Sequence, residues 1–308
     1  MTTDAIQTTP PPAEHEAVET DIPARLDRLP WGRFHWLLIT ALGVTWVLDG
    51  LEATIVASIG STLMLPQALG LSAGQIGLAG TLYLAGAIAG ALVFGHLTDR
   101  LGRKKLFTVT LAIYLAGAVL TAFAWDFWSF VLFRVITGLA IGGEYSAINS
   151  AIDELIPARV RGRVDLAVNG TFWIGAAAGA AVSLVLLDPR YFPVWLGWRV
   201  SFGLGGLVGA AMIFARQHVP ESPRWLLTHG RAGEAEEVMR QIEARAAGGA
   251  PLPPVTQRMK VYPGTEVGFG TIAHTMLVGY RSRAFLGLAL IASQAFFYNS
   301  RCEKCLEK

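Results

Sequence analysis

The feature that most constrains this chain is a series of long apolar runs. An α-helix needs about 20 predominantly apolar residues to cross the hydrocarbon core of a bilayer, and the runs in this sequence approach or exceed that length. None of them has a polar face that could be turned toward water. The sequence therefore predicts an all-α, polytopic membrane protein. Its six spans, with boundaries soft by a few residues, cover residues 36–59, 75–95, 106–125, 128–152, 164–187 and 200–215.

The composition excludes an ordinary soluble protein. Hydrophobic residues make up 53% of the 308 residues and charged residues only 16%, and the mean hydropathy is +0.45. This is far too apolar for a soluble globular protein of this size. The only two cysteines, Cys302 and Cys305, lie close to the end of the chain, so the sequence offers no disulfide framework.

The segments outside the spans differ in character. Residues 1–30 are polar and proline-rich, so we expect a disordered cytoplasmic tail before the six-span bundle of residues 31–215. Residues 216–283 are predicted to form a cytoplasmic loop with surface helices followed by a flexible linker. A seventh span starts over residues 284–300 and gives way to an atypical charged tail, 301–308. Because this span stops early, we expect either a truncated chain or a last segment that is not the natural continuation.

The distribution of Lys and Arg predicts the orientation. Cytoplasmic loops of membrane proteins are enriched in these residues. Residues 95–106 carry four of them and residues 60–74 none, while only Arg190 and Arg199 fall on the opposite side. We therefore expect a cytoplasmic N-terminus in the cell membrane. The other basic residues on the cytoplasmic side are Arg25, Arg28, Arg33, Arg159, Arg161 and Arg163.

Glycines recur at four-residue spacing within the spans. Between helices in lipid there is little hydrophobic driving force, so association depends on close backbone approach at small residues. We expect these glycines to mark helix contacts. The pairs are Gly86 with Gly90, Gly138 with Gly142, Gly175 with Gly179, and Gly205 with Gly209.

Few ionisable side chains lie inside the spans. Asp49 and Glu52 lie in the first span, and Arg134 and Glu144 in the fourth. A charge at the bilayer centre costs ~2.5–3.5 kcal/mol on insertion scales, so each one is expected to have a partner or a wet cavity and to serve function. At the rise of an α-helix, Glu52 lies about 10 Å, Asp49 about 15 Å and Arg134 about 9 Å below the same membrane surface.

These depths predict proton coupling by Glu52, Asp49 and Arg134. The two acids are three residues apart and so share one helix face. If Arg134 faces them, a carboxylate can exchange its guanidinium partner for a proton. Two acids facing one base leave one acid to titrate. The alternative is a permanent salt bridge that only orders the bundle.

A basic turn between the second and third spans carries a family resemblance. Its sequence, GHLTDRLGRKKL, contains the pattern G-x-x-x-D-R-x-G-R-K, which resembles the loop between helices two and three of the major facilitator superfamily of secondary transporters. The fourth span, RVITGLAIGGE, resembles the R-x-x-x-G-x-x-x-G pattern of the same superfamily. The resemblance implies the N-terminal six-helix half of a major facilitator fold plus a partial seventh helix. A C-terminal six-helix half is expected as partner but is absent from this chain.

Further motifs resemble sugar porters. LDGLEATIVAS looks like their first-span motif and places Glu52 at the coupling acid, whereas Asp49 is more reminiscent of metabolite:proton symporters. Glu154 and Arg161 match E-x-x-P-x-x-x-R-G, and PESPRWL follows the sixth span. The resemblance implies a cytoplasmic ion-pair network that breaks in every transport cycle, because exposed pairs are worth only ~0–1 kcal/mol; a plain surface network is the alternative. The residues assigned to it are Gly95, Asp99, Arg100, Gly102, Arg103, Glu144, Glu154, Arg161, Glu221 and Arg224.

Three amides are candidates for binding a solute. Asn169 stands where sugar porters have a substrate-binding Gln, and Gln294 with Asn299 repeats the Q-x-x-x-x-N of their seventh span. Amides donate and accept hydrogen bonds, which suits hydroxyl-rich or carboxylate ligands. Trp173 is expected to add an apolar wall, together with Phe172 and Trp46; lipid or core packing is the alternative for these aromatic residues.

The sequence thus predicts a secondary transporter of a small organic solute, either a sugar or an organic acid, driven by protons through alternating access. The alternative is a half-transporter that is inactive alone or needs a partner half. No histidine cluster, nucleophile motif or metal spacing accompanies the spans, so we expect no enzyme activity, cofactor, metal site or nucleic-acid partner.

Overall fold

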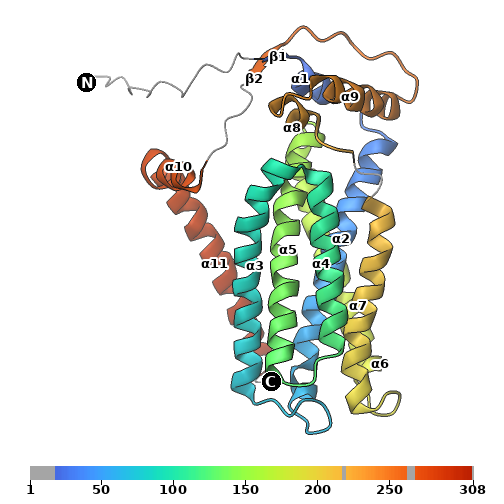
Figure 1. Ribbon diagram of the computed structural model, residues 1–308, viewed down its shortest axis with the longest axis vertical. Helices are drawn as coiled ribbons and strands as arrows, with labels where there is room; N and C mark the ends of the chain where they lie inside the picture. Colours follow the sequence, from blue (N-terminus) through green and yellow to red (C-terminus); the bar gives the residue numbers. More distant parts are fainter. Residues whose placement is uncertain (1–17, 217–219, 262–267, 307–308) are drawn as a thin grey trace. The chain divides into compact units, whose positions relative to one another are not determined.

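The computed structural model describes residues 18–216, 220–261 and 268–306. They belong to two compact units, Met1–Pro263 and Gly264–Lys308. In the first unit, the long helices α2 to α7 form a bundle, and short elements cover one of its ends (Figure 1). The bundle helices are Arg33–Leu63 (α2), Ala73–Leu101 (α3), Arg103–Ala122 (α4), Phe127–Leu155 (α5), Arg161–Leu186 (α6) and Val194–Arg216 (α7).

Each predicted span is helical. Within the described part of the chain, α2 to α6 are long and apolar enough to cross a membrane, and the 23 residues of α7 correspond to about 34 Å of helix. The all-α prediction is confirmed. α7 begins six residues earlier than predicted because Arg199 does not interrupt it: its guanidinium donates to the Trp195 and Ala124 carbonyl oxygens at 2.8 and 3.0 Å.

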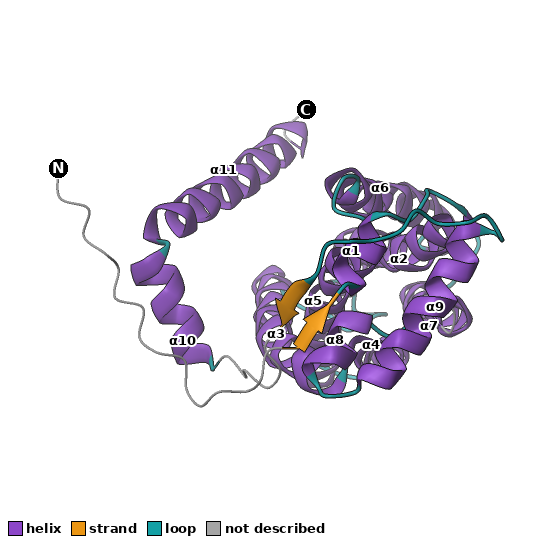
Figure 2. Cartoon of the chain, turned by 90° about the horizontal axis from the view of Figure 1, so that it is seen from above, coloured by secondary structure: helices purple, strands orange, loops and turns teal. Residues whose placement is uncertain are grey.

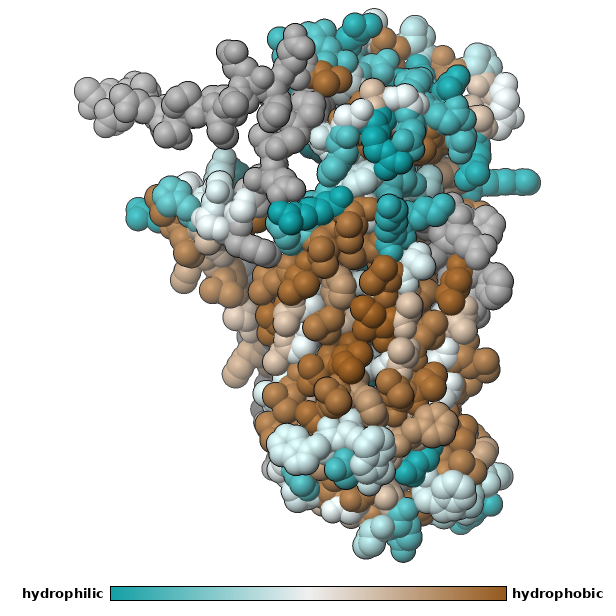
Figure 3. All heavy atoms as spheres, in the orientation of Figure 1, coloured by the Kyte–Doolittle hydropathy of each residue, from teal (hydrophilic) through white to brown (hydrophobic). Residues whose placement is uncertain are grey.

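The outer surface of the bundle is apolar over its middle part, as contact with the hydrocarbon of a bilayer requires. Large apolar side chains such as Ile88 and Leu92 on α3 are more than half exposed. On the face shown in Figure 3, hydrophobic residues cover the middle of the bundle and hydrophilic ones lie toward its ends. Exposure of this kind is unfavourable in water but favourable against lipid chains.

The described residues of the second unit, 268–306, form three helical elements. They are Phe269–His274 (α10), the π-helix Thr275–Gly279 (η1) and Arg281–Leu306 (α11). α11 includes the predicted start of a seventh span, residues 284–300, and continues to Leu306. The helix therefore does not end where the sequence changes from apolar to charged after residue 300. α10 and η1 lie in the stretch predicted to be a flexible linker, and that prediction is wrong for their residues.

Glycines set the closest helix contacts in the bundle. α2 lies against α6, and α3 lies against α5. At the glycines named below, an added Cβ atom would lie closer to the backbone of the partner helix than van der Waals radii allow. The predicted pairs in α3, α5 and α6 therefore mark real helix crossings, because only Gly permits this approach. The contacts join Gly50, Gly175 and Gly179 across α2 and α6, and Gly86, Gly90, Gly138 and Gly142 across α3 and α5.

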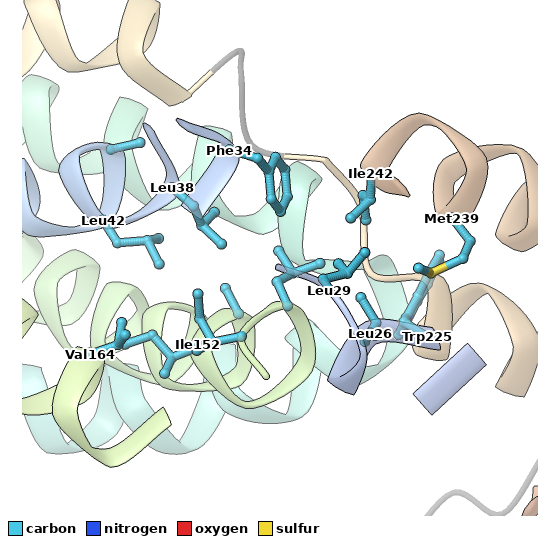
Figure 4. Close-up of a cluster of buried hydrophobic side chains, with 14 of the residues drawn as sticks. Leu26, Leu29, Phe34, Leu38, Leu42, Ile152, Val164, Trp225, Met239 and Ile242 are labelled. Atoms are coloured by element: carbon cyan, nitrogen blue, oxygen red, sulfur yellow. The ribbon is translucent and has the colours of Figure 1, made fainter. Parts of the chain in front are cut away.

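Short elements form a cap at one end of the bundle, which we call the capped end. They are Ile22–Asp27 (α1), Pro223–Thr228 (α8) and Ala232–Ala247 (α9), with the antiparallel strands Val18–Thr20 (β1) and Met259–Val261 (β2). Figure 2 views the bundle from this end. Leu26 and Leu29 pack into an apolar cluster with Trp225, Met239 and Ile242 (Figure 4).

The cap corrects two sequence predictions. Residues 18–30 are not a disordered tail, since Leu29 is fully buried and β1 pairs with β2; residues 1–17 lie outside the described part of the chain. β2 also falls within the predicted flexible linker. Local sequence gave no indication of either strand, because each is only three residues long and is stabilised by its distant partner.

Charged hydrogen bonds hold α1 on α9. Arg25 donates to Glu243 at 2.7 Å and to Glu236 at 2.7 Å, and Arg28 also pairs with Glu243. The hydrogen bond from Arg25, with a further one from Arg28, lowers the pKa of Glu243 below its ordinary value. The charged form of Glu243 is therefore the form that stabilises the docked cap.

We predict that replacing Gly90 by Ala destabilises the bundle by about 1–3 kcal/mol, the usual range for overpacking a tight contact. The added methyl group would press on the carbonyl oxygen of Leu139 in α5. Thermal unfolding in detergent measures the change. Gly80→Ala is the matched control on the same helix, because an added Cβ there meets nothing within 4 Å. Equal unfolding midpoints for the two variants would contradict the assigned α3–α5 contact.

We also predict that docking of α1 weakens in acid. Because the pKa of Glu243 is lowered in the folded state, its contribution is fully present above the ordinary glutamate pKa of about 4.3. That contribution is lost as pH falls through the lowered value. Amide hydrogen exchange of residues 22–27, corrected for intrinsic rates, should show protection falling in this range. In Glu243→Gln the protection should be weaker at neutral pH and much less sensitive to pH; an unchanged pH profile would exclude Glu243 as the responsible group.

Candidate functional site

A buried ion pair joins α2 to α5 in the interior of the bundle. The Arg134 guanidinium donates from Nη1 to Oε1 of Glu52, and the two side chains are only 4% and 5% exposed. Arg134 also lies over the ring of Tyr83, 4.2 Å from its centroid, and 5.6 Å from the centroid of Phe202. The structure thus brings together the acid and base that their depths in the membrane predicted to meet.

Helix packing explains why this pair forms. Gly50 lies against the α6 backbone, which leaves Asp49 and Glu52 on another face of α2. Gly138 seats α5 against α3, and Arg134, one turn earlier on nearly the same side of α5, contacts Tyr83 on α3 as well as Glu52 on α2. The ion pair therefore joins the two close helix pairs, α2 with α6 and α3 with α5, among apolar contacts.

Asp49 has a different partner from Glu52. Its Oδ2 accepts a hydrogen bond from the hydroxyl of Tyr145 on α5. Trp46 stacks on the ring of Tyr145 with centroids 4.6 Å apart and planes 10° apart. Arg134 thus pairs with Glu52, and Asp49 is the second acid, whose role in proton coupling stays a prediction.

Tyr145 is a functional candidate that sequence reasoning missed. It follows Arg134 by eleven residues, about three helical turns, so both lie on one face of α5. Trp46, Asp49 and Glu52 are likewise spaced by three residues along α2. The regular spacing on both helices indicates that Tyr145 faces the same interior region as Arg134. A search for charged residues does not find it, because tyrosine carries no charge.

Glu144 belongs to the interior rather than to the capped end. The sequence analysis placed it in the cytoplasmic network, but it is 4% exposed and lines a small cavity with Asp49, Tyr114 and Tyr145. Eleven residues separate it from the end of α5 at Leu155, which corresponds to about 16 Å along the helix. The prediction is corrected: Glu144 accompanies the buried acids.

A large cleft opens beside these residues toward the capped end. It has a volume of about 710 Å³ and runs between α2, α5 and α6. Asn169 lines it and donates to the Asp165 carboxylate at 3.1 Å. The other lining residues are Trp46, Tyr145, Asn149, Ile152, Asp153, Ala158, Arg161, Gly162 and Asp165.

The other predicted solute-binding residues are Trp173 in the bundle and two amides of the second unit. Trp173 is 58% exposed and meets Phe172 edge-on, but it does not line the cleft; Trp46 does. Gln294 is an exposed residue of α11 in the second unit. The side chain of Asn299, also on α11, lies outside the described residues. The assignment of Gln294 and Asn299 to a solute site stays a prediction.

At the capped end, Arg103 is the centre of the observed network. It donates from Nη2 to Glu154 at 2.6 Å and lies 3.4 Å from Asp99. Arg103 and Glu154 are only 10% and 11% exposed, so this pair is far more buried than the weak surface latch that was predicted. A buried pair loses more when it is broken, because each charge is then left without its partner.

Glu221 caps the start of α4. α3 and α4 are separated by the single residue Gly102, whose φ of +91° is a conformation that favours glycine. Gly102 has no side chain to accept from the first amides of α4, so the Glu221 carboxylate does so, at 2.9 Å from the nitrogen of Arg103 and 3.3 Å from that of Lys104. A carboxylate at a helix N-terminus also gains from the helix dipole.

The remaining network residues are more dispersed. Arg161 pairs with Asp153 at 3.6 Å rather than with Glu154. Arg100 and Arg224 are exposed, on the last turn of α3 and the first turn of α8. Gly95 lies beside the Ser146 side chain on α5. The structure therefore groups Asp99, Arg103, Glu154 and Glu221, and places Arg161 at the cleft.

Comparison with known proteins identifies relatives of this chain. The family model described as "Sugar (and other) transporter" matches residues 48–301. The chain belongs to this transporter family. It is 34% identical over 247 residues to the niacin transporter NiaP of Acinetobacter baylyi (strain ATCC 33305 / BD413 / ADP1), a match that covers 78% of this chain and 54% of that protein. It is 30% identical over 180 residues to a D-xylose transporter of Levilactobacillus brevis, covering 58% and 38% of the two chains.

Solved structures show the fold. The proton:xylose symporter XylE, bound to 6-bromo-6-deoxy-D-glucose, superposes with a TM-score of 0.62 at 21% identity, covering 70% of this chain and 51% of that one. A partially occluded inward-open form of XylE from E. coli gives a TM-score of 0.60. The fold is thus the N-terminal half of a major facilitator transporter, a multi-pass membrane fold. The chain spans about half the length of the relatives it matches.

We predict that Glu221→Ala lowers the stability of the bundle by about 0.5–2 kcal/mol, the usual loss on removing a helix cap. Thermal unfolding in detergent, followed by circular dichroism, measures it. Glu237→Ala is the control, because Glu237 makes exposed contacts within α9, with Arg240 and Gln241, and exposed pairs of this kind are worth about 0.3–0.5 kcal/mol. Similar losses in both variants would show that Glu221 is an ordinary surface acid.

Proposed function

We propose that this chain forms the proton-coupling half of a secondary transporter for a small organic solute. The observation that carries the proposal is the buried Glu52–Arg134 pair between α2 and α5. The alternative is a permanent salt bridge that only orders the bundle. The contacts of Glu52 and Arg134 bear on this alternative, and the uptake experiment below tests it.

The pair is incomplete in a way that favours exchange. One carboxylate oxygen of Glu52 accepts from Arg134, but the other, Oε2, is buried and has no hydrogen-bond partner in the described residues. A buried pair is stabilising only if its remaining lone pairs are also satisfied. Protonation would turn this oxygen into a hydroxyl group and remove an incompletely satisfied charge.

Arg134 has other contacts when Glu52 is neutral. Its guanidinium lies over the Tyr83 ring, and contacts of this kind are worth about 2 kcal/mol or more when desolvated. The guanidinium therefore retains a favourable surrounding if the pair opens. Because the pair connects α2 with α5, protonation of Glu52 would loosen one helix pair from the other.

In this proposal, the cleft forms one side of the path that the solute takes. Its wall combines the Trp46–Tyr145 aromatic stack with the amide of Asn169 and the charges of Asp153 and Arg161. Apolar surfaces with a few polar groups are typical of small-molecule sites. We propose a sugar or an organic acid as the solute, in keeping with the xylose and niacin named for the relatives.

Alternating access assigns a role to the capped end. We propose that it faces the cytoplasm of a cell whose plasma membrane holds the chain, since the basic residues of the α3–α4 turn lie there. The Arg103–Glu154 pair and the Glu221 cap would then close the cytoplasmic side of the path in one state and open in the other.

The test is uptake by the purified 308-residue chain in proteoliposomes. An inward proton gradient should drive entry of radiolabelled D-xylose or nicotinate together with protons. Glu52→Gln, which cannot lose a proton, should abolish gradient-driven uptake, whereas Glu237→Gln on the exposed face of α9 should not. Solute uptake that survives in Glu52→Gln would contradict proton coupling at this residue.

The second candidate function is a half-transporter that needs a partner. It is favoured by the length of the match, about half of the relatives. In that case the chain alone would transport neither solute, and uptake would appear when a chain carrying the other half is reconstituted with it. Uptake by the chain alone would exclude this alternative.

A further inference from the structure

We propose that protons reach Glu52 through the hydroxyl group of Tyr114, which stands between this acid and a second acidic site formed by Asp49 and Glu144. The inference rests on the proposed role of Glu52 in proton coupling. It adds a second proton-holding site and a defined route between the two.

The Tyr114 hydroxyl lacks a permanent partner. Tyr114 lies on α4, is 3% exposed, and its hydroxyl is buried without a hydrogen bond among the described residues. A buried unpaired polar group costs about 1–3 kcal/mol, and buried tyrosines usually satisfy their hydroxyl. Phenylalanine would fill the same space without this loss. The hydroxyl therefore points to a transient partner.

Two small cavities meet at Tyr114. One is lined by Glu52, Ser201 and Phe202, and the other by Asp49, Glu144 and Tyr145; Tyr114 lines both. Each has room for about one water molecule. On the first side, the unpartnered Oε2 of Glu52 is a natural acceptor for the hydroxyl or for a bridging water.

The second cavity is suited to hold a proton. Arg134 pairs with Glu52, while Asp49 and Glu144 lie on the other side of Tyr114. Two carboxylates that share a buried site favour binding one proton between them, because like charges in a low dielectric repel strongly. The Tyr145 hydroxyl donates to Oδ2 of Asp49 and so holds this carboxylate at the second cavity.

The route continues to the large cleft. Tyr145 and its stacking partner Trp46 line that cleft, and Tyr145 also lines the Asp49 cavity. The route therefore connects Glu52 with the side that we propose to be cytoplasmic, and protons can cross it in either direction. During uptake, a proton released from Glu52 would pass Tyr114 and then Asp49 and Glu144 before it reaches the cleft; after a pH jump, the same route returns protons to Glu52.

The transfer step balances without any further reactant. A water in the second cavity, protonated by Asp49 or Glu144, gives a proton to the phenol oxygen of Tyr114. The phenol O–H bond on the other side breaks, and its proton forms a bond to Oε2 of Glu52. Tyr114 ends neutral, one carboxyl group of the second site becomes a carboxylate, and Glu52 becomes neutral and releases Arg134.

Ionisable groups face Tyr114 from several helices. They determine how its environment responds to pH, and all must be considered in interpreting a titration. The groups are Asp49 and Glu52 on α2, Tyr83 on α3, and Arg134, Glu144 and Tyr145 on α5, whereas α7 contributes Ser201 and Phe202.

The test measures proton arrival at Glu52 directly. Infrared difference spectra of the purified chain after a pH jump report the carbonyl band of protonated carboxyl groups, and the component missing in Glu52→Gln identifies Glu52. In Tyr114→Phe this component should appear on the order of 100-fold more slowly, as expected on losing a positioned proton-transfer group. Tyr191→Phe, at a 68% exposed tyrosine, is the matched control and should behave like the unmodified chain.

Stability separates the route from a structural role. Because the Tyr114 hydroxyl has no hydrogen bond to lose, Tyr114→Phe should unfold at the same temperature as the unmodified chain or higher. A clear loss of stability, or an unchanged rate of Glu52 protonation, would overturn the route. If no band component is missing in Glu52→Gln, the proposed coupling role of Glu52 itself fails, which is a distinct result.

Discussion

A guanidinium held in the apolar interior of a helix bundle is the constraint around which this structure is built. Arg134 is almost fully buried on α5, and a charge in that position needs a counter-charge or an aromatic surface. It has both, from Glu52 on α2 and Tyr83 on α3. Three helices are thereby tied to a single side chain. A change in the charge of Glu52 would therefore affect how all three helices pack.

The glycines and the buried charges depend on one another. Close backbone approach at Gly175 in α6 and at Gly90 in α3 creates two tight helix pairs. The contacts between these pairs combine apolar side chains, such as Leu48 and Ile141, with Glu52, Asp49 and their hydrogen-bond partners. Small residues thus bring the backbones together within each pair, and the ionisable residues lie between the pairs. This division is suited to a carrier whose helices must move as groups.

Much of this architecture could be predicted from the sequence, and the failures have identifiable causes. Hydropathy located the spans because no alternative buries such long apolar runs, and helical rise placed Glu52 opposite Arg134 because depth depends only on counting residues. The partner of Asp49 could not be found in this way: Tyr145 is uncharged, and charge was the property being matched. Glu144 was assigned to the cytoplasmic network although its position in the fourth span already places it within the membrane. The β1–β2 pair was missed because a three-residue strand has no signal without its partner.

Gly102 gives the capped end a mechanical property. It is the sole residue between α3 and α4, and Glu221, just before α8, accepts hydrogen bonds from the first amides of α4. Trp225 on α8 in turn donates to the Asp99 carbonyl oxygen at 2.7 Å, near the end of α3. At the corner where these three helices meet, two side chains, of Glu221 and Trp225, therefore bond to main-chain atoms of α3 and α4. Rotation of α3 or α4 at this corner would therefore move α8 with it. The tilt of these two membrane helices would in this way change the position of a segment outside the membrane.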